Sequence, residues 1–284
     1  MSFIYDQPGP RGRRNILIGS VLSVMAIAGV VALALWQFGS HGQLAPEVWA
    51  PFTQWAIWKY LLTGLVGTLE VAGIVAVLGS VIGVFLALGR LSHFRPTRWF
   101  CTAYIEAART VPVLLLIYLM LFGLPQLGIN VPVLWKLAIP LVFSNSAVFA
   151  EIVRAGIKSL PKGQSEAALS LGMSSWQTMF HVVLPQALRN IAPSLLSQFV
   201  SLLKDTTLGY IVAFTELLYR GQLLTSYLHQ LIPTYIVITL IYLVVSGSLT
   251  AIASRLQRRP RRKAASPTDP LKAPTMGHSA AAIH

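Results

Sequence analysis

Four polar residues lie inside stretches that are otherwise apolar. Asn145 stands in the run FSNSAVF, while Lys204, Asp205 and Thr206 belong to the sequence KDTT, which interrupts a second apolar segment. Polar side chains in such surroundings either join one membrane helix to another by hydrogen bonds or line a path for a polar solute. Both alternatives remain open for Asn145. Because Gly209 follows KDTT, we expect the second segment to be bent or broken there.

Four charged residues form two pairs whose members are three positions apart. Glu106 precedes Arg109, and Glu151 precedes Arg154. Residues at this spacing are neighbours on a helix surface. An unpaired charge at the centre of a membrane helix costs about 2.5 to 3.5 kcal/mol on insertion scales. We therefore predict two structural ion pairs, Glu106 with Arg109 and Glu151 with Arg154.

Sequence motifs for catalysis are absent. The chain contains no G-x4-GK[ST] phosphate loop, no HExxH and no GxSxG, and its six histidines are scattered singly. These patterns would place a nucleotide, a metal ion or a nucleophile in a defined geometry. We expect a protein that is not an enzyme, with no catalytic residue, no metal site and no cofactor bound by this chain.

The composition is typical of a membrane protein built from helices. The chain has 284 residues, of which 55% are hydrophobic and 11% are charged. The apolar residues form blocks close to the roughly 20 residues that a helix needs to cross a bilayer, without the short alternation of an outer-membrane barrel. We predict an all-α polytopic membrane protein with six transmembrane helices, at 16–36, 66–89, 103–124, 137–157, 191–218 and 232–253.

The distribution of positive charge predicts the orientation of these helices. The net charge is +13, which in a soluble protein would raise the question of a nucleic-acid partner. With the N-terminus inside, only Lys59, Lys136 and Arg220 fall on the outer side, and the loops on the inner side carry most of the Lys and Arg. This asymmetry follows the positive-inside rule. We predict that both termini are cytoplasmic and that no nucleic acid is bound.

The two ends of the chain differ from its middle. Residues 1–15 are predicted to be a cytoplasmic N-terminus, and the apolar run 16–36 is too long for the roughly 7 to 15 apolar residues of a signal peptide, which favours a retained anchor. Residues 259–284 are rich in Pro and Ala after a basic start. We predict a disordered cytoplasmic tail, whose basic start is either a stop-transfer anchor or a contact for anionic lipid.

A half-polar helical stretch, GQSEAALSLGMSSWQTMFHVVLP at 163–185, lies on the cytoplasmic side in this topology. A first short helix is expected to begin near Gln164 and to end at Gly172, the usual residue type after a helix C-terminus. Ser174 and Gln177 have the spacing of a capping box, which predicts a second helix. Pro185 is expected to end that helix.

The second helix has one continuous apolar face. Its residues follow the i, i+3, i+4, i+7, i+8 pattern and are Trp176, Met179, Phe180, Val183 and Leu184. Such a face lies either in the bilayer interface or in a groove of a cytoplasmic partner.

The same stretch resembles the EAA loop of ABC-importer permeases, whose pattern is EAA, x3, G, x9, I, x, LP. The matching residues are Glu166, Ala167, Ala168, Gly172, Val182, Leu184 and Pro185, with Val182 in place of the usual Ile. Further segments, including YIEAARTVPVLLLIYLMLFGLP and SRLQRR, extend the likeness over about 60–258. Over this range the chain resembles the polar amino acid permease family, which serves uptake of histidine, glutamate/aspartate, glutamine, arginine and opines.

The resemblance implies a fold and roles for particular residues. Residues 60–258 would form a five-helix type I importer core, with 16–36 as an additional N-terminal helix. The loop at 158–189 would be the coupling helix that sits in a cleft of an ATPase subunit. Lys204, Asp205 and Thr206 would lie near the translocation path or its gate. The residues that would couple to the ATPase are Glu166, Ala167, Ala168, Gly172, Trp176 and Phe180.

The resemblance also implies a location and a set of partners. The chain would be a multi-pass permease of the bacterial inner membrane that moves polar amino acids, with glutamate and aspartate as the favoured substrates. Its partners would be two ATPase subunits that bind ATP and Mg, a second permease subunit, identical or homologous, a periplasmic amino-acid-binding protein and the lipid bilayer. Transport would proceed by alternating access.

Two other classes of protein fit the sequence less well. An ion-coupled secondary amino acid transporter would typically show internal repeats, and it would leave the EAA pattern unexplained. An intramembrane enzyme would need a catalytic or metal-binding motif, which the sequence lacks.

Overall fold

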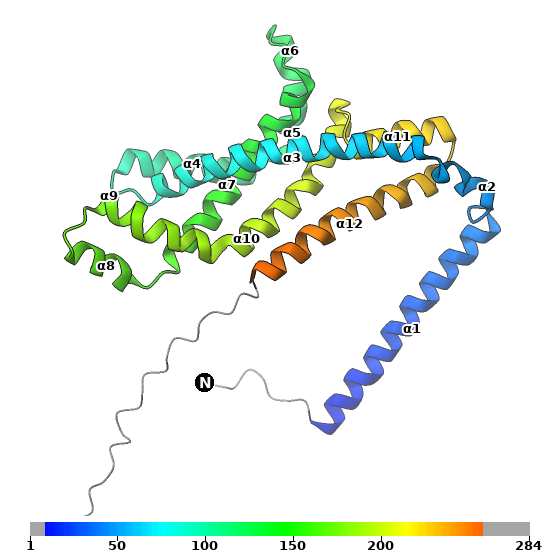
Figure 1. The fold of residues 1–284 in the computed structure, drawn as a ribbon, viewed down its shortest axis with the longest axis horizontal. Coiled ribbons are helices and arrows are strands. Elements are labelled where there is room, and N and C mark those ends of the chain that lie inside the picture. The colour runs from blue at the N-terminus through cyan, green and yellow to red at the C-terminus, as the bar shows by residue number, and fades with distance from the viewer. Residues whose placement is uncertain (1–8, 258–284) are drawn as a thin grey trace, which may run out of the picture.

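The computed structural model describes residues 9–257, which fold into helices joined by short turns (Figure 1). The predicted tail 259–284 and residues 1–8 of the predicted cytoplasmic N-terminus lie outside the described residues. The helices are α1 (Pro10–Ser40), α2 (Pro46–Trp49), η1 (Ala50–Thr53), α3 (Trp55–Arg90), α4 (Arg95–Thr110), α5 (Val113–Tyr118), η2 (Leu119–Gly123), α6 (Leu124–Gln126), α7 (Val133–Lys158), α8 (Lys162–Ser170), α9 (Ser175–Gln177), η3 (Thr178–Val183), α10 (Leu184–Asp205), η4 (Thr206–Val212), α11 (Leu217–Leu228) and α12 (Leu231–Gln257).

Four of the described helices are long and apolar enough to cross a membrane. They are α1, α3, α7 and α12, and the bent pair formed by α4 with α5–α6 gives a fifth candidate if it counts as one crossing. Helices are therefore confirmed at 16–36, 66–89, 137–157 and 232–253. The helix predicted at 66–89 begins earlier, at Trp55, and has 36 residues. It is thus longer than the roughly 20 residues that a crossing requires.

The segment predicted as one transmembrane helix at 103–124 is broken in the structure, and it remains a candidate crossing only as a bent pair. The segment is divided between α4 and α5, whose axes differ in direction by 92°. The break lies at Val111, which has an extended conformation with ψ of 122°, and at Pro112. A proline disfavours the helical conformation of the residue before it and cannot donate a backbone hydrogen bond. The break was not predicted, because the residues on both sides of it are apolar.

The segment at 191–218 is also interrupted, as KDTT and Gly209 predicted. Helix α10 ends at Asp205, a 3₁₀ turn follows in η4, and Ala213 adopts a left-handed conformation with φ of 56°. Within residues 9–257, α10 is not one of the helices that meet the length and hydropathy expected of a crossing. The sixth crossing and the cytoplasmic position of both termini stay predictions.

Helices α3 and α7 form the centre of the bundle, and α10 packs against both. Their close approach depends on Gly83, where an added Cβ would lie 2.6 Å from the Cβ of Phe149 and 3.0 Å from the backbone nitrogen of Ala150. Small residues at such positions let membrane helices pack backbone to backbone. The fully buried Phe149 ring is held between the helices in this way.

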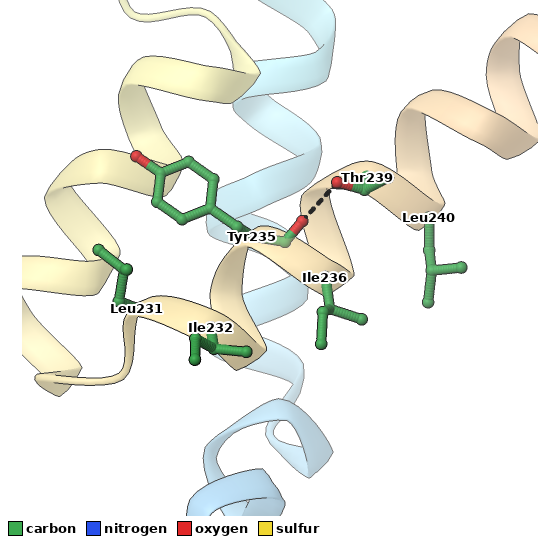
Figure 2. A pocket seen from close by; sticks show the side chains of 6 residues that line it. All are labelled: Leu231, Ile232, Tyr235, Ile236, Thr239 and Leu240. Carbon is green, nitrogen blue, oxygen red and sulfur yellow. Dashed lines mark hydrogen bonds between the residues drawn. The ribbon is translucent and has the colours of Figure 1, made fainter. Parts of the chain in front are cut away.

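Helix α1 does not pack on this centre, and one face of α12 is exposed. Helix α1 stands apart from the bundle in Figure 1, and its most apolar 18-residue window has no buried residue. A shallow groove of about 350 Å³ runs along α12 (Figure 2), lined by Leu231, Ile232, Tyr235, Ile236, Thr239 and Leu240. Because a single helix lines it, the groove is open, apolar outer surface, and ligand sites are typically enclosed by several elements.

Candidate functional site

The first helix of the 158–189 loop ends as the sequence predicted. Gly172 has φ of +83°, which is the left-handed conformation that glycine adopts without strain. Its N–H donates to the carbonyl of Leu169 at 3.0 Å, and the N–H of Met173 donates to the carbonyl of Ala168 at 3.2 Å. These two bonds form a Schellman motif, which closes helix α8 and turns the chain sharply.

The second helix begins with the predicted capping box. The N–H of Gln177 donates to Oγ of Ser174 at 3.3 Å, and the N–H of Ser174 donates to Oε1 of Gln177 at 2.9 Å. The two reciprocal bonds satisfy backbone donors that the first helical turn leaves free. Only Met173 separates this cap from Gly172, so the hydrogen bonds of the Schellman motif and of the capping box together fix the angle between the two helices.

The prediction that Pro185 ends the second helix is wrong. Helices α9, η3 and α10 follow one another without a gap, so that one helical segment runs from Ser175 to Asp205. The turn before Pro185 is a π-helix, in which the N–H of Leu184 donates to the carbonyl of Met179. A proline ring collides with the carbonyl four residues earlier in an α-helix. The wider π-turn accommodates the ring, and the helix continues.

The predicted apolar face of this helix is divided between two environments. Val183 and Leu184 are buried, and Phe180 packs on the core cluster that contains Leu184. The Trp176 ring contacts that of Phe180 in a tilted arrangement, with 4.1 Å between ring centroids, yet 70% of its surface is exposed. The remaining part of the face therefore packs within the chain, while Trp176 is presented outward.

The outer surface of the loop combines apolar and acidic groups. Leu171 is 85% exposed, and Leu169 and Glu166 are also exposed. Of the EAA residues, Ala167 is exposed and Ala168 is buried. Gln186 donates to Oε1 of Gln164 at 3.2 Å and so joins α10 to α8. The loop is thus attached to the bundle on one side and offers Leu169, Leu171 and Trp176 on the other.

Asn145 and Asp205 are brought together from two helices. Asn145 on α7 is buried, and its Nδ2 donates to the carbonyl of Leu141 at 3.0 Å. Its Oδ1 accepts a hydrogen bond of 2.9 Å from Nε2 of Gln198 on α10, and its side chain also interacts with the half-buried Asp205. The sequence did not predict a role for Gln198. Its position seven residues before Asp205, two helical turns away on the same face, was the available signal.

The other two polar residues of this segment point elsewhere. Lys204 is exposed, whereas Thr206 is fully buried and donates from its hydroxyl to the carbonyl of Leu203 at 2.7 Å. Neighbouring residues on a helix face different directions, which accounts for the separation of Lys204 from Asp205. The polar centre of the bundle therefore consists of Asn145, Gln198 and Asp205.

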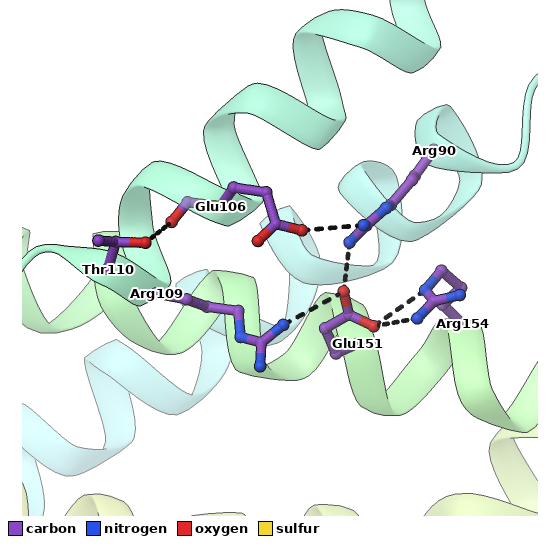
Figure 3. Close-up of polar contacts among 6 residues, drawn as sticks. All are labelled: Arg90, Glu106, Arg109, Thr110, Glu151 and Arg154. Carbon is purple, nitrogen blue, oxygen red and sulfur yellow. Dashed lines mark hydrogen bonds and ion pairs between the residues drawn. The ribbon is translucent and has the colours of Figure 1, made fainter.

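A cluster of ion pairs joins α3, α4 and α7 (Figure 3). Glu151 accepts hydrogen bonds from Nε and Nη2 of Arg154 at 2.9 and 2.6 Å, as predicted, and it also bonds to Arg90 and lies 3.7 Å from Nη1 of Arg109. Arg90 bridges to Oε1 of Glu106 at 3.0 Å. One carboxylate thus holds three guanidinium groups at the end of the bundle.

The predicted pair of Glu106 with Arg109 is wrong. Among the ion pairs of residues 9–257, Glu106 is joined to Arg90 and Arg109 to Glu151. Packing of α4 across α3 and α7 gives each of these side chains a partner on another helix, which helix periodicity does not reveal. Arg90 was missed because its partners are 16 and 61 residues away in the sequence.

Replacement of Glu151 by glutamine is expected to destabilise the bundle by about 1 to 2 kcal/mol. This value lies between those of exposed and buried ion pairs, since the Glu151 side chain is 20% exposed. Three arginines would then face a neutral amide. The melting temperature of the purified chain in detergent measures the loss. Glu106→Gln is the matched control, because that side chain is 56% exposed and has one partner; equal effects of the two substitutions would contradict the central role of Glu151.

One fully buried carboxylate, that of Glu216, was not predicted from the sequence. Glu216 is fully buried and caps α11, accepting 2.7 Å hydrogen bonds from the N–H groups of Leu218 and Tyr219. Tyr242 on α12 donates to the same carboxylate at 3.2 Å, and Thr68 on α3 accepts from the N–H of Leu217 at 3.1 Å. The turn after η4 is thereby tied to α3 and α12. The signal was an acidic residue before an apolar helix start, typical of an N-cap.

Among residues 9–257 no group of three or more His, Cys, Asp or Glu side chains is arranged to hold a metal ion. At Asn145, Gln198 and Asp205 the described chain gathers amide and carboxylate groups that can form hydrogen bonds. The loop, in turn, offers an apolar and acidic contact surface.

Comparison with known proteins gives a consistent family assignment. Residues 79–262 match the family described as the binding-protein-dependent transport system inner membrane component. The chain is 42% identical over 226 residues to the glutamate transport system permease protein GluD of Corynebacterium glutamicum, covering 78% of this chain and 82% of the relative. It is 38% identical over 208 residues to the glutamate/aspartate import permease protein GltK of Escherichia coli O6:H1, covering 70% of this chain and 93% of the relative.

A solved structure shares both fold and sequence with the chain. The crystal structure of an amino acid ABC transporter with histidines superposes with a TM-score of 0.67 at 33% identity, covering 71% of this chain and 94% of the other. The family match over residues 79–262 includes the 158–189 loop and the polar centre.

Proposed function

The chain belongs to the binding-protein-dependent transport family of inner-membrane components, the permease subunits of ABC importers, and we propose that it carries polar amino acids, glutamate and aspartate first among them, across the bacterial inner membrane. The chain supplies the membrane path. ATP hydrolysis belongs to a separate subunit that binds ATP and Mg, because the sequence has no phosphate loop of its own.

One observation carries the proposal: a rigidly capped loop is continuous with the polar centre of the bundle. The Schellman motif at Gly172 and the capping box at Ser174 fix the loop, and the unbroken helical segment Ser175–Asp205 leads from there to Asp205. A displacement applied to the loop would therefore reach Asp205 without a flexible joint between them.

The exposed side chains of the loop suit an ATPase partner. Leu169, Leu171 and Trp176 would enter an apolar cleft of that subunit, with Glu166 as the group that accepts a hydrogen bond or an ion pair. Phe180 would support Trp176 from within the chain, since the two rings are in contact. Ala167 and Gly172 are exposed and would let the ATPase backbone approach the loop closely, while the buried Ala168 would let α8 pack closely within the chain.

The polar centre suits the charged groups of a free amino acid. The Asp205 carboxylate complements the α-ammonium group, and the amides of Asn145 and Gln198 can donate to or accept from the α-carboxylate. Asn145 lies on α7, whereas Gln198 and Asp205 lie on α10. These side chains would therefore separate or approach as the path opens to one side of the membrane or the other. Lys204 and Thr206 would lie at the border of the translocation path.

The proposed cycle requires further subunits. Two ATPase subunits would dock on two permease subunits, which are either two copies of this chain or this chain with a homologue, and a periplasmic amino-acid-binding protein would deliver the substrate. ATP-driven closure of the ATPase pair would move the two loops together and shift the bundle from inward-facing to outward-facing. Hydrolysis would reset it. The ligands act by binding one of the two states more tightly than the other.

Uptake into proteoliposomes tests the function. The complete transporter, reconstituted with its ATPase and binding protein, is expected to accumulate radiolabelled glutamate or aspartate when ATP is present at the ATPase side, in the absence of any ion gradient. Histidine, glutamine and arginine serve as competing substrates that identify the preference. Uptake that requires an ion gradient and no ATP would instead establish an ion-coupled secondary transporter and would exclude the proposal.

A further inference from the structure

The start of α4 carries three aromatic side chains that are exposed. They are Phe94, which precedes the helix, and Trp99 and Phe100 in its first two turns, and Trp99 is 74% exposed. The same helix packs on the core through its other face, with Cys101, Ile105 and Ala108 buried. Packing within the described chain therefore leaves these aromatics uncovered.

Two arginines stand among these aromatics without a carboxylate partner in residues 9–257. Arg95 and Arg98 are exposed, and the described ion pairs involve Arg90, Arg109 and Arg154 instead. No Asp or Glu occurs between Leu91 and Ile105. The positive charge of this segment is thus left for a partner from outside the described chain.

The order of the residues places a cation next to a ring. Arg95 and Trp99 are four residues apart and share one side of α4, and Arg98 follows Phe94 by the same interval. Aromatic rings prefer the level of the lipid head groups, and a guanidinium group binds phosphate through two parallel hydrogen bonds. The five residues Phe94, Arg95, Arg98, Trp99 and Phe100 are called the α4 patch below.

The position of the α4 patch in the fold identifies the surface that it meets. Helix α4 lies at the same end of the bundle as the loop formed by α8 and α9 (Figure 1), the end that the positive-inside distribution assigns to the cytoplasm. The cytoplasmic leaflet carries anionic lipids and a negative surface potential. A patch with positive and aromatic side chains and no acidic ones is complementary to that surface.

We propose that the α4 patch binds anionic phospholipid in the cytoplasmic leaflet. Arg95 and Arg98 hold the phosphate groups, while Phe94, Trp99 and Phe100 lie among the glycerol groups and upper acyl chains. The bound lipid fixes the start of α4, and the far part of the same helix provides Glu106 and Arg109 to the ion-pair cluster. Lipid composition would thereby affect the stability of the joint between α3, α4 and α7.

Quenching of Trp99 fluorescence by brominated lipid tests the proposal directly. The full chain is placed in bilayers of phosphatidylethanolamine that contain, at the same mole fraction, either brominated phosphatidylglycerol or brominated phosphatidylethanolamine. The Trp99 signal is the difference between the wild type and Trp99→Phe. Each arginine near an anionic surface contributes about fivefold enrichment, the equivalent of about 1 kcal/mol. Trp99 should therefore be quenched at least about twofold more by the anionic lipid.

A second variant separates lipid binding from general exposure to the bilayer. In Arg95→Gln/Arg98→Gln the two brominated lipids are expected to quench Trp99 equally. Trp36 on α1, which is 67% exposed and has no arginine within four residues, is the control and should show no preference in either protein. Equal quenching of Trp99 in the wild type would overturn the proposal. So would a double variant that keeps its lipid preference, or one that instead loses association with an ATPase subunit in detergent free of anionic lipid.

Discussion

Gly172→Val is expected to reduce ATP-dependent uptake about 30-fold while leaving membrane insertion intact. The backbone at this position has φ of +83°, and a β-branched residue in that conformation is strained by about 2 to 3 kcal/mol. No heavy atom of a neighbouring side chain lies within 4 Å of the position that a Cβ would take, so the cost is conformational. The loop would turn differently between α8 and α9 and would present Leu171 and Trp176 at the wrong angle.

Gly172→Asn provides the matched control, because asparagine tolerates the left-handed conformation far better than valine. The asparagine variant is expected to retain most of the uptake and most of the affinity for the ATPase subunit. Co-purification of the ATPase with each variant and uptake into proteoliposomes are the two measurements. Full uptake by the valine variant would show that the turn at Gly172 does not set the contact with the ATPase.

Asp205→Asn is expected to lower uptake by about 30- to 100-fold. A hydrogen bond to a charged group is worth about 1.5 to 3 kcal/mol, and the asparagine would also remove the charge that complements the ammonium group of the substrate. The helical segment Ser175–Asp205 and the interaction with Asn145 place this carboxylate at the centre of the bundle. Assembly with the ATPase and its basal ATP hydrolysis should be nearly unchanged.

Lys204→Gln distinguishes a substrate contact from a general effect of charge at this place. Lys204 is adjacent in sequence but exposed, and its loss is expected to change uptake by no more than about threefold, the range of a surface charge. Equal losses in the two variants, or a normal uptake in Asp205→Asn, would contradict a role of Asp205 in binding the substrate. A fall in basal ATP hydrolysis together with uptake would indicate misfolding instead.

Periodicity and local hydrogen bonding allowed much of the structure to be predicted. The helices at 16–36, 137–157 and 232–253, the left-handed residue Gly172 and the capping box at Ser174 depend on residues close together in the sequence. Such features are set by interactions within one or two helical turns. The break after Asp205 was also predictable, since polar residues and a glycine stand together there.

Features that depend on contacts between helices were not predicted. The bend at Pro112 was concealed by the apolar residues on both sides of it, although a proline carried the signal. The partners of Arg90 come from α4 and α7, and their positions depend on the angle at which α4 crosses the other helices. The same is true of Tyr242, which reaches Glu216 from α12. Spacing along one helix contains no information on these contacts.

The π-turn Thr178–Val183 sets the azimuth of the whole loop. Such a turn holds one more residue than an α-helical turn, and each residue of an α-helix advances by about 100°. Trp176 therefore emerges roughly a quarter of a revolution away from the direction that unbroken α-helical winding would give it relative to α10. The one extra residue of this turn, rather than any particular side chain, thus determines the direction in which α9 and Trp176 face relative to α10.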